Sequence, residues 1–364
     1  KRPKLRFPGF DEPWSIYKAE ELFKNVADKN HPMETVLTII QGKGTLPREQ
    51  AGRNIHYDDA SLANYKKVEQ GDFIIHLRSF EGGLEMANED GIVSPAYTIL
   101  RCKKPHSSLF YEAYFHTDEF INHILSKSVE GIRDGRQISY EAFKWLGLPY
   151  CDVSEQERIA QLFCTLSHRI EKQQQMVDAL KKYKRGLIKL VFEKVMSEAH
   201  YQLPLSDLCI SISSGRTTVN ESNGRYPLFG STGIVGMTNT IEHDGDIVMV
   251  ARVGANAGKV NFFSGRCGVT DNTLVIRVKE NTIHPKFLAY FLENFDLHKL
   301  IFGSGQPLVT GGQLKKIQSP VIAYKAQLLI TRSLESLDRI IGTQDTYMEK
   351  LIQLKSGLMQ RLFI

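Results

Sequence analysis

Residues 149–192 and 320–363 decide how this chain folds, because they are two copies of one sequence. The first copy reads PYCDVSEQERIAQLFCTLSHRIEKQQQMVDALKKYKRGLIKLVF, and the second reads PVIAYKAQLLITRSLESLDRIIGTQDTYMEKLIQLKSGLMQRLF. They align without a gap at an offset of 171 positions, with eleven identities in 44 residues. An internal repeat of this kind indicates that the chain consists of two half-molecules in tandem.

Both copies follow a heptad pattern, in which core positions recur at alternating spacings of four and three residues. In the first copy these positions are Ile159, Phe163, Leu166, Ile170, Gln173, Val177, Leu180, Lys184, Leu187 and Val191. Such a pattern, held for more than four heptads, predicts a long helix that pairs as a coiled coil. The spacing of Ser154 and Glu157 predicts a capping box at its start. The alternative is that the two helices belong to the cores of separate domains.

Polar residues at core positions predict how the two helices pair. Gln173 and Lys184 in the first copy correspond to Gln344 and Lys355 in the second. A parallel pair would place the two lysines together in an apolar seam, which is costly. An antiparallel pair can place Gln173 opposite Lys355 and Lys184 opposite Gln344, with apolar residues facing each other elsewhere. We therefore predict an antiparallel coiled coil in that register.

The segments before each helix also correspond, so the repeat extends to globular domains. Gly71–Ile75 resembles Gly245–Met249, and Gly91–Arg101 resembles Gly268–Arg277, each reading as a turn followed by a strand. The predicted fold class is α+β. Two globular α/β domains, residues 1–148 and 197–319, alternate with two long helices, in residues 149–196 and 320–364. Antiparallel pairing would relate the halves by a pseudo-twofold axis.

Composition narrows the class of protein. The chain has 364 residues and a net charge of +5. Residues 1–150 and 197–320 carry only −1 and +1, so the excess lies in the repeated helices. Five scattered cysteines, with no CxxC pair, argue against a disulfide framework or a zinc site. The sequence has neither an apolar run long enough for a membrane span nor a signal-peptide pattern, so we expect a cytoplasmic location.

Motifs for catalysis are missing from the sequence. The nearest one is Gly254-Ala-Asn-Ala-Gly258-Lys259-Val260, which has three residues between its glycines and no Ser or Thr after the lysine. A phosphate-binding P-loop needs four residues there and the hydroxyl. We therefore expect no catalytic residues and no metal site. Two alternatives stay open: an enzyme that binds a nucleotide on these loops, and a structural tandem coiled-coil adaptor without a role in DNA binding.

Several loops carry side chains that suit contacts to bases and phosphates, since Arg, Lys, Asn, Gln, Ser and Thr supply the donors that read guanine edges and bind phosphate oxygens. Comparable loops occur in both halves, which favours a shared role in DNA binding. The candidate DNA-binding residues in the first half are Lys43, Arg48, Arg53, Asn54, Arg78, Ser79, Arg136 and Gln137. Those in the second half are Arg216, Thr217, Thr218, Arg225, Ser231, Thr232, Arg252, Asn256, Lys259 and Gln306.

Taken as a whole, the chain resembles the DNA-specificity subunit of type I restriction–modification systems. The resemblance covers the opening Leu5–Phe10 and Glu12–Trp14, the segment Pro149–Gln156, and the helix ends Lys184–Phe192 and Lys355–Phe363. It also covers the order of domain, helix, domain, helix. The second repeat departs from the family's Glu-Gln pair before the helix, because it has Ala326-Gln327.

The resemblance implies a subunit that is not itself an enzyme. Each target-recognition domain would read one half of a bipartite double-stranded DNA target, and the helices would set the spacing and dock two methyltransferase subunits. Those subunits would supply S-adenosylmethionine and methylate adenine, with the target base flipped into their own pockets. Restriction subunits, with ATP and Mg²⁺, would complete the complex, so no cofactor is expected in this chain and no membrane is involved.

Overall fold

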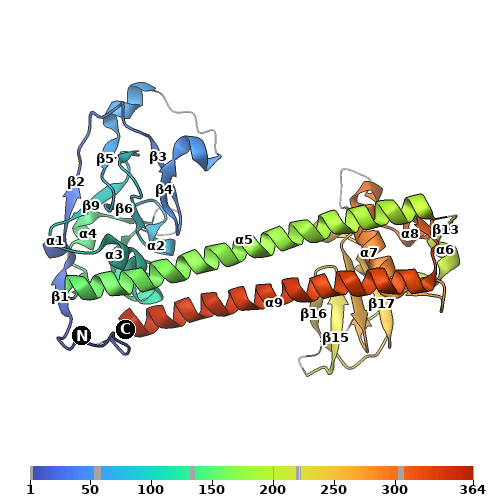
Figure 1. The fold of residues 1–364 in the computed structure, drawn as a ribbon. Coiled ribbons are helices and arrows are strands. Elements are labelled where there is room, and N and C mark those ends of the chain that lie inside the picture. The colour runs from blue at the N-terminus through green and yellow to red at the C-terminus, as the bar shows by residue number, and fades with distance from the viewer. Residues whose placement is uncertain are drawn as a thin grey trace. The chain divides into compact units, whose positions relative to one another are not determined.

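The computed structural model describes residues 3–52, 59–131, 136–199, 201–218, 221, 223–301 and 307–363. It divides into two compact units, Lys1–Gln174 with Tyr347–Ile364 and Gln175–Thr346. Each unit combines one α/β domain with part of the long helix α5 (Val153–Glu198) and part of the long helix α9 (Tyr324–Phe363) (Figure 1). The two long helices predicted from the heptads are therefore confirmed.

The domain of the first unit is built on an antiparallel sheet in the order β2-β9-β6-β7. Its strands are β2 (Phe23–Val26), β9 (Thr98–Cys102), β6 (Phe73–Ile75) and β7 (Glu85–Met86). Smaller pairs surround it: β1 (Ser15–Lys18) with β12 (Gly147–Tyr150), β3 (Leu37–Ile40) with β4 (Gly44–Pro47), β5 (Lys66–Val68) with β8 (Gly91–Val93), and β10 (Val129–Glu130) with β11 (Gln137–Ile138). The α-helices of this domain are α1 (Ala19–Leu22), α2 (Ser79–Gly82), α3 (Ser108–Phe115) and α4 (Tyr140–Phe143).

The domain of the second unit has an antiparallel sheet in the order β14-β20-β17-β18. Its strands are β14 (Cys209–Ser214), β20 (Thr273–Val278), β17 (Asp246–Ala251) and β18 (Val260–Ser264). A second sheet joins β16 (Gly233–Thr238), β15 (Tyr226–Gly230) and β19 (Gly268–Val269), and β13 (Gln202–Pro204) pairs with β21 (Gln318–Pro320). Its α-helices are α6 (Leu205–Leu208), α7 (Pro285–Phe295) and α8 (Gly311–Lys315).

The two domains share one topology, which confirms the tandem repeat. Strands β2, β9, β6 and β7 take the same places in their sheet as β14, β20, β17 and β18 take in theirs. The matched sequence segments become β6 and β17 at the third position of each sheet, and β9 and β20 at the second. In each domain a hairpin also comes between the first and third strands of the sheet in chain order: β3–β4 in the first and β15–β16 in the second.

The ends of the long helices are part of the domain cores. Phe363, near the end of α9, is buried in the first unit, where its ring stacks on Phe163 of α5 at 5.8 Å between centroids. Phe192, its counterpart in the repeat, is buried in the second unit against Phe287 and Phe291 of α7. Burying such a ring contributes about 1.5–3 kcal/mol. The helices therefore combine the two interpretations of the heptads, since they pair with each other and also complete the cores.

A buried glutamine fixes the start of each long helix. In the first unit, Gln156 accepts a hydrogen bond from the backbone N–H of Ser107, just before α3, at 3.0 Å, and donates to the carbonyl of Cys151 at 2.9 Å. In the second, Gln327 accepts from the backbone N–H of His284, just before α7, at 2.7 Å. Both glutamines are at most 1% exposed. The same residue of the repeat thus joins the long helix to the main domain helix in both units.

The predicted capping box at Ser154 is wrong. Helix α5 begins at Val153, and Asp152 caps it by accepting from the backbone N–H of Ser154 at 2.9 Å. Asp152 precedes the helix by one residue and its carboxylate favours the positive end of the helix dipole, so it caps better than Ser154, which lies inside the first turn.

The N-terminal segment closes the first unit. Glu155, fully buried, receives a bidentate contact from the guanidinium of Arg6 at 2.7 and 2.8 Å and a hydrogen bond from the indole of Trp14. The backbone N–H of Leu5 donates to the carbonyl of Arg361 in α9 at 2.9 Å. The Glu-Gln pair of the first repeat is thereby explained, because its glutamate pairs with the N-terminal segment. Ala326 has no carboxylate at the equivalent position.

Within each unit the two long helices run antiparallel, as predicted, but the two core lysines contact other residues than the predicted glutamines. The ammonium of Lys184 contacts Asp338 at 2.8 Å, six residues before the expected Gln344. The ammonium of Lys355 donates to the hydroxyl of Ser167 at 2.8 Å, six residues before the expected Gln173. The long stems of the two lysines let their charged groups reach these partners beside the apolar seam. Other contacts lie closer to the predicted register: Lys181 contacts Asp345 at 3.0 Å and Phe163 stacks on Phe363, each pair only two residues out of it.

Among the helices in the described part of the chain, none has both the length and the apolar composition to cross a lipid bilayer.

Candidate DNA-recognition loops

The turn between β3 and β4 presents Lys43 in the first domain. Gln41, Gly42 and Lys43 are exposed, and Gly42 and Gly44 adopt φ of +74° and +75°, a region that favours glycine. A Cβ on Gly44 would also lie 2.5 Å from the carbonyl oxygen of Met86. The glycines on either side of Lys43 therefore serve the backbone, and the lysine is left as the cationic side chain of the turn.

Buried polar groups hold this turn from behind. The fully buried carboxylate of Glu85 accepts from the N–H of Gly42 at 2.6 Å and from the N–H of Gly44 at 2.9 Å, and lies 3.3 Å from Nε2 of His116. The amide of Asn88 donates to the carbonyl of Lys43 at 2.8 Å. Burial alone would raise the pKa of Glu85, but the hydrogen bonds from His116 and the two glycines lower it, so the carboxylate is charged at neutral pH.

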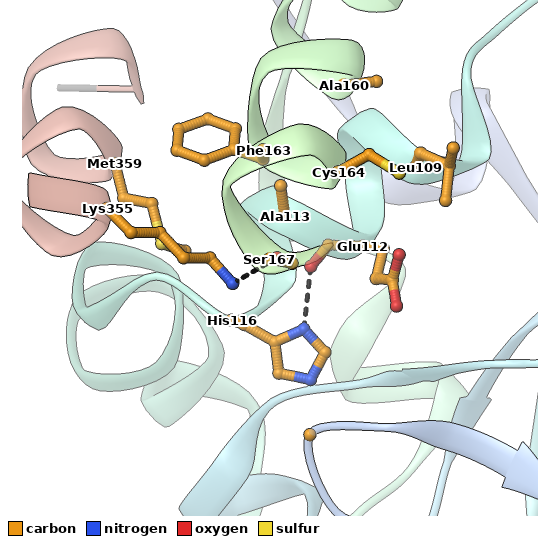
Figure 2. A pocket seen from close by; sticks show the side chains of 11 residues that line it. Leu109, Glu112, Ala113, His116, Ala160, Phe163, Cys164, Ser167, Lys355 and Met359 are labelled. Carbon is orange, nitrogen blue, oxygen red and sulfur yellow. Dashed lines mark hydrogen bonds between the residues drawn. The ribbon is translucent and has the colours of Figure 1, made fainter. Parts of the chain in front are cut away.

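The ring of His116 also borders a cavity of about 360 Å³ between α3, α5 and α9 (Figure 2). Its Nδ1 lies 2.8 Å from the backbone carbonyl of Glu112, and Lys355 reaches Ser167 on the opposite wall. Burial would lower the pKa of His116, but its contact with Glu85 raises it. Among the described residues, no group of three His, Cys, Asp or Glu side chains could hold a metal ion.

The other candidates of the first domain differ in accessibility. Arg78 and Gln137 are exposed, Arg48 is half-buried, and the exposed Arg136 lies over the ring of Phe80 at 4.4 Å. Ser79 is fully buried, and its hydroxyl accepts from the backbone N–H of His76 at 2.8 Å, so it serves the fold and is not accessible to DNA. Arg53 and Asn54 lie outside the described residues.

In the second domain, the loop after β14 presents Arg216 and Thr218, which are both exposed. Thr217 between them is buried, so its predicted contact with DNA is replaced by an internal one: its hydroxyl donates to Glu242 at 2.7 Å. The same carboxylate accepts from the backbone N–H of Arg216 at 2.9 Å, of Thr217 at 3.2 Å and of Val269 at 3.3 Å. Burial would raise the pKa of Glu242, but these hydrogen bonds lower it.

The loop between β17 and β18 carries Arg252, Asn256 and Lys259, of which the first two are half-buried. It turns through the 3-10 segment Gly254–Asn256 and leads into strand β18, with φ of +87° at Gly258. A P-loop leads into a helix whose N-terminal amides bind phosphate, so this geometry argues against a nucleotide site. Lys259 is exposed, and the guanidinium of Arg252 donates weakly to the carbonyl of Asp271 at 3.4 Å.

The β15–β16 turn carries Ser231, which is half-buried, and Thr232, which is exposed. It corresponds by topology to the turn that carries Lys43 in the first domain. Arg225, before β15, is also exposed, and Gln306 lies outside the described residues.

The carboxylates of Glu85, which is buried, and Glu242, which is half-buried, were missed in the sequence, which offers no signal for them. Glu85 is 43 residues from Gly42, and Glu242 is 25 residues from Thr217. Neither pair follows a motif, and an acidic residue is not an obvious part of a DNA-binding surface.

Comparison with known proteins supports the resemblance seen in the sequence. Residues 202–351 match the type I restriction modification DNA specificity domain. The chain is 28% identical over 123 residues to the Type I restriction enzyme EcoprrI specificity subunit of Escherichia coli. The matched stretch makes up 34% of this chain and 30% of that protein. The chain is also 28% identical over 156 residues to the Type I restriction enzyme MjaVIII specificity subunit of Methanocaldococcus jannaschii, which is 39% and 36% of the two chains.

The matched stretches therefore span about a third of these curated relatives. The fold is similar to the type I restriction-modification system S subunit of M. genitalium over 100% of this chain and 99% of that one, with a TM-score of 0.66 and 14% identity. That structural likeness concerns the fold.

Proposed function

We infer that this chain, whose sequence and fold resemble those of type I restriction–modification specificity subunits, recognises a bipartite double-stranded DNA target. One observation carries the proposal: two domains of the same topology each present loops with exposed cationic side chains, Lys43 and Arg78 in one and Arg216 and Lys259 in the other. Their loops differ in sequence, so the two half-sites should differ.

The paired helices are the proposed docking site for methyltransferase subunits. Exposed apolar side chains recur at seven-residue spacing along each helix, which places them on one stripe. On α5 they are Met176, Tyr183 and Leu190, and on α9 they are Ile340, Tyr347 and Leu354. Apolar stripes left in water on a helix are typical of protein interfaces.

Two glycines add to this proposal. Gly186 and Gly357 are equivalent in the repeat and lie inside α5 and α9, where glycine costs up to about 1 kcal/mol relative to alanine. A Cβ at either position would meet nothing within 4 Å. The chain's own packing does not require glycine there, which supports close approach of a partner at both positions.

The chemistry would come from partner subunits: S-adenosylmethionine with the methyltransferases, and ATP with Mg²⁺ in restriction subunits. Because phosphate contacts dominate affinity for DNA, domains as close to neutral as these should bind DNA weakly until the partners join.

The experiment is to express the chain with its methyltransferase in a host and to map methylated adenines by single-molecule sequencing. Methylation confined to a split motif, with two short half-sites and a fixed gap, is expected. A contiguous motif would contradict reading by two domains. A DNA pull-down with and without the methyltransferase tests the structural-adaptor alternative, which predicts no DNA in either case.

A further inference from the structure

We propose that Glu85 and Glu242 are positioning residues for DNA reading, each holding the backbone of a loop that contacts the target. The inference rests on the function proposed above and names residues that set its specificity.

The two carboxylates share one arrangement although they come from different places in the topology. Glu85, in β7, binds the N–H groups of Gly42 and Gly44, which flank the exposed Lys43. Glu242, before β17, binds the N–H groups of Arg216 and Thr217 and so holds the exposed Arg216 by its own backbone. In both domains a carboxylate, buried at Glu85 and half-buried at Glu242, accepts from the backbone of a loop that carries an exposed cation.

Burial makes these anchors unusual. Glu85 is fully buried and the side chain of Glu242 is 17% exposed. A buried carboxylate is costly unless its lone pairs are satisfied. Here backbone N–H groups of the loops satisfy them, together with His116 in the first domain and the Thr217 hydroxyl in the second. The loops and the charges therefore depend on each other.

A loop ordered in advance binds its target with a smaller loss of conformational entropy. The anchors also place negative charge behind a surface that faces phosphates. They should therefore favour the correct target, through ordered loops, while slightly opposing attraction to DNA of any sequence.

This combination predicts opposite effects on two kinds of DNA. In the complex with methyltransferase, Glu242→Gln should weaken binding to a duplex carrying the mapped motif by roughly tenfold to a hundredfold, the range expected when a few residues lose their order. Binding to a duplex with a scrambled motif should be unchanged or stronger, because a negative charge is removed. Methylation should become relaxed in one half-site only.

Glu85→Gln should relax the specificity for the other half-site in the same way. Matched controls are Glu280→Gln and Glu130→Gln, which neutralise exposed glutamates of the second and first domains. Thr217→Val is a milder variant that removes only the hydroxyl donor of the second anchor, and it should relax the same half-site as Glu242→Gln to a smaller degree.

Wild-type recognition by both glutamine variants would overturn the inference and leave the proposed function intact. A second pattern would also overturn the inference. In it, the glutamine variants lose specific and non-specific binding equally, which indicates general unfolding, and Thr217→Val keeps wild-type recognition. If the wild-type complex methylates no split motif, the proposed function fails and this inference fails with it.

Discussion

Gln156 offers a direct measure of how strongly the long helix is joined to the first domain. In Gln156→Ala, the backbone N–H of Ser107 loses its acceptor and the carbonyl of Cys151 loses its donor. A buried group left without a partner costs about 1–3 kcal/mol. Cys151 is buried, so its carbonyl falls at the upper end, while Ser107 is half-buried and can recover a water. Together they predict a loss of about 3 kcal/mol in the stability of the first unit.

The two units make a single unfolding free energy poorly defined, so hydrogen exchange with mass spectrometry is the suitable assay. A loss of about 3 kcal/mol corresponds to roughly a hundredfold faster exchange in α3 and the first turns of α5. Peptides of the second unit should keep their rates, and Gln327→Ala should show the reverse pattern. Gln161→Ala, at an exposed position of the same helix, is the control. Unchanged exchange in α3, or an equal increase in both units, would refute the reasoning.

Three further predictions concern the helices and the buried ion pair. Gly186→Ala should stabilise α5 by up to about 1 kcal/mol, whereas Gly186→Trp should keep helical circular dichroism but lose the methyltransferase in co-purification; retained assembly would contradict the docking proposal. Inserting one heptad into each long helix adds about 10.5 Å of helix, which corresponds to roughly three base pairs. The gap between the half-sites of the mapped motif should therefore lengthen, or methylation should be abolished. An unchanged gap would show that the helices do not set the gap. The lowered pKa of Glu85 contributes stability that is lost as pH falls below its ordinary value of 4.5, and the raised pKa of His116 contributes stability that is lost as pH rises above 6.5. The thermal unfolding temperature of the first unit should therefore be highest between pH 4.5 and pH 6.5. Glu85→Gln should make this temperature less dependent on pH.

The sequence predicts the long helices because a heptad pattern reports on local periodicity, which a helix converts directly into one apolar face. It also predicts their antiparallel direction, because like charges would otherwise meet. The partners of the core lysines could not be predicted in the same way. Lys184 is drawn to Asp338 and to Glu293 of α7, and no core position of the heptad reveals that a neighbouring helix offers a carboxylate.

The candidate loops could likewise be predicted from the sequence only in part. Exposed cations such as Lys43 and Arg216 stand out in the sequence because they sit among glycines and small polar residues. The sequence does not show which neighbours turn inward. Ser79 and Thr217 look like surface residues, yet both are buried. The Ser79 hydroxyl accepts from the backbone of His76 three residues before it, whereas the Thr217 hydroxyl donates to Glu242, which is 25 residues away.

In the first unit the N-terminal segment is hydrogen-bonded to the end of α9, and this contact bears on how the order of the domains along the chain could change. The backbone of Leu5 is hydrogen-bonded to Arg361, so the two ends of the described chain lie within a peptide's reach of each other. A peptide joining them would make a continuous ring of domain, helix, domain, helix, and such a ring can be opened at an exposed loop without removing any core contact. A gene encoding the parts in rotated order should therefore specify the same fold, whichever of the two α/β domains is translated first.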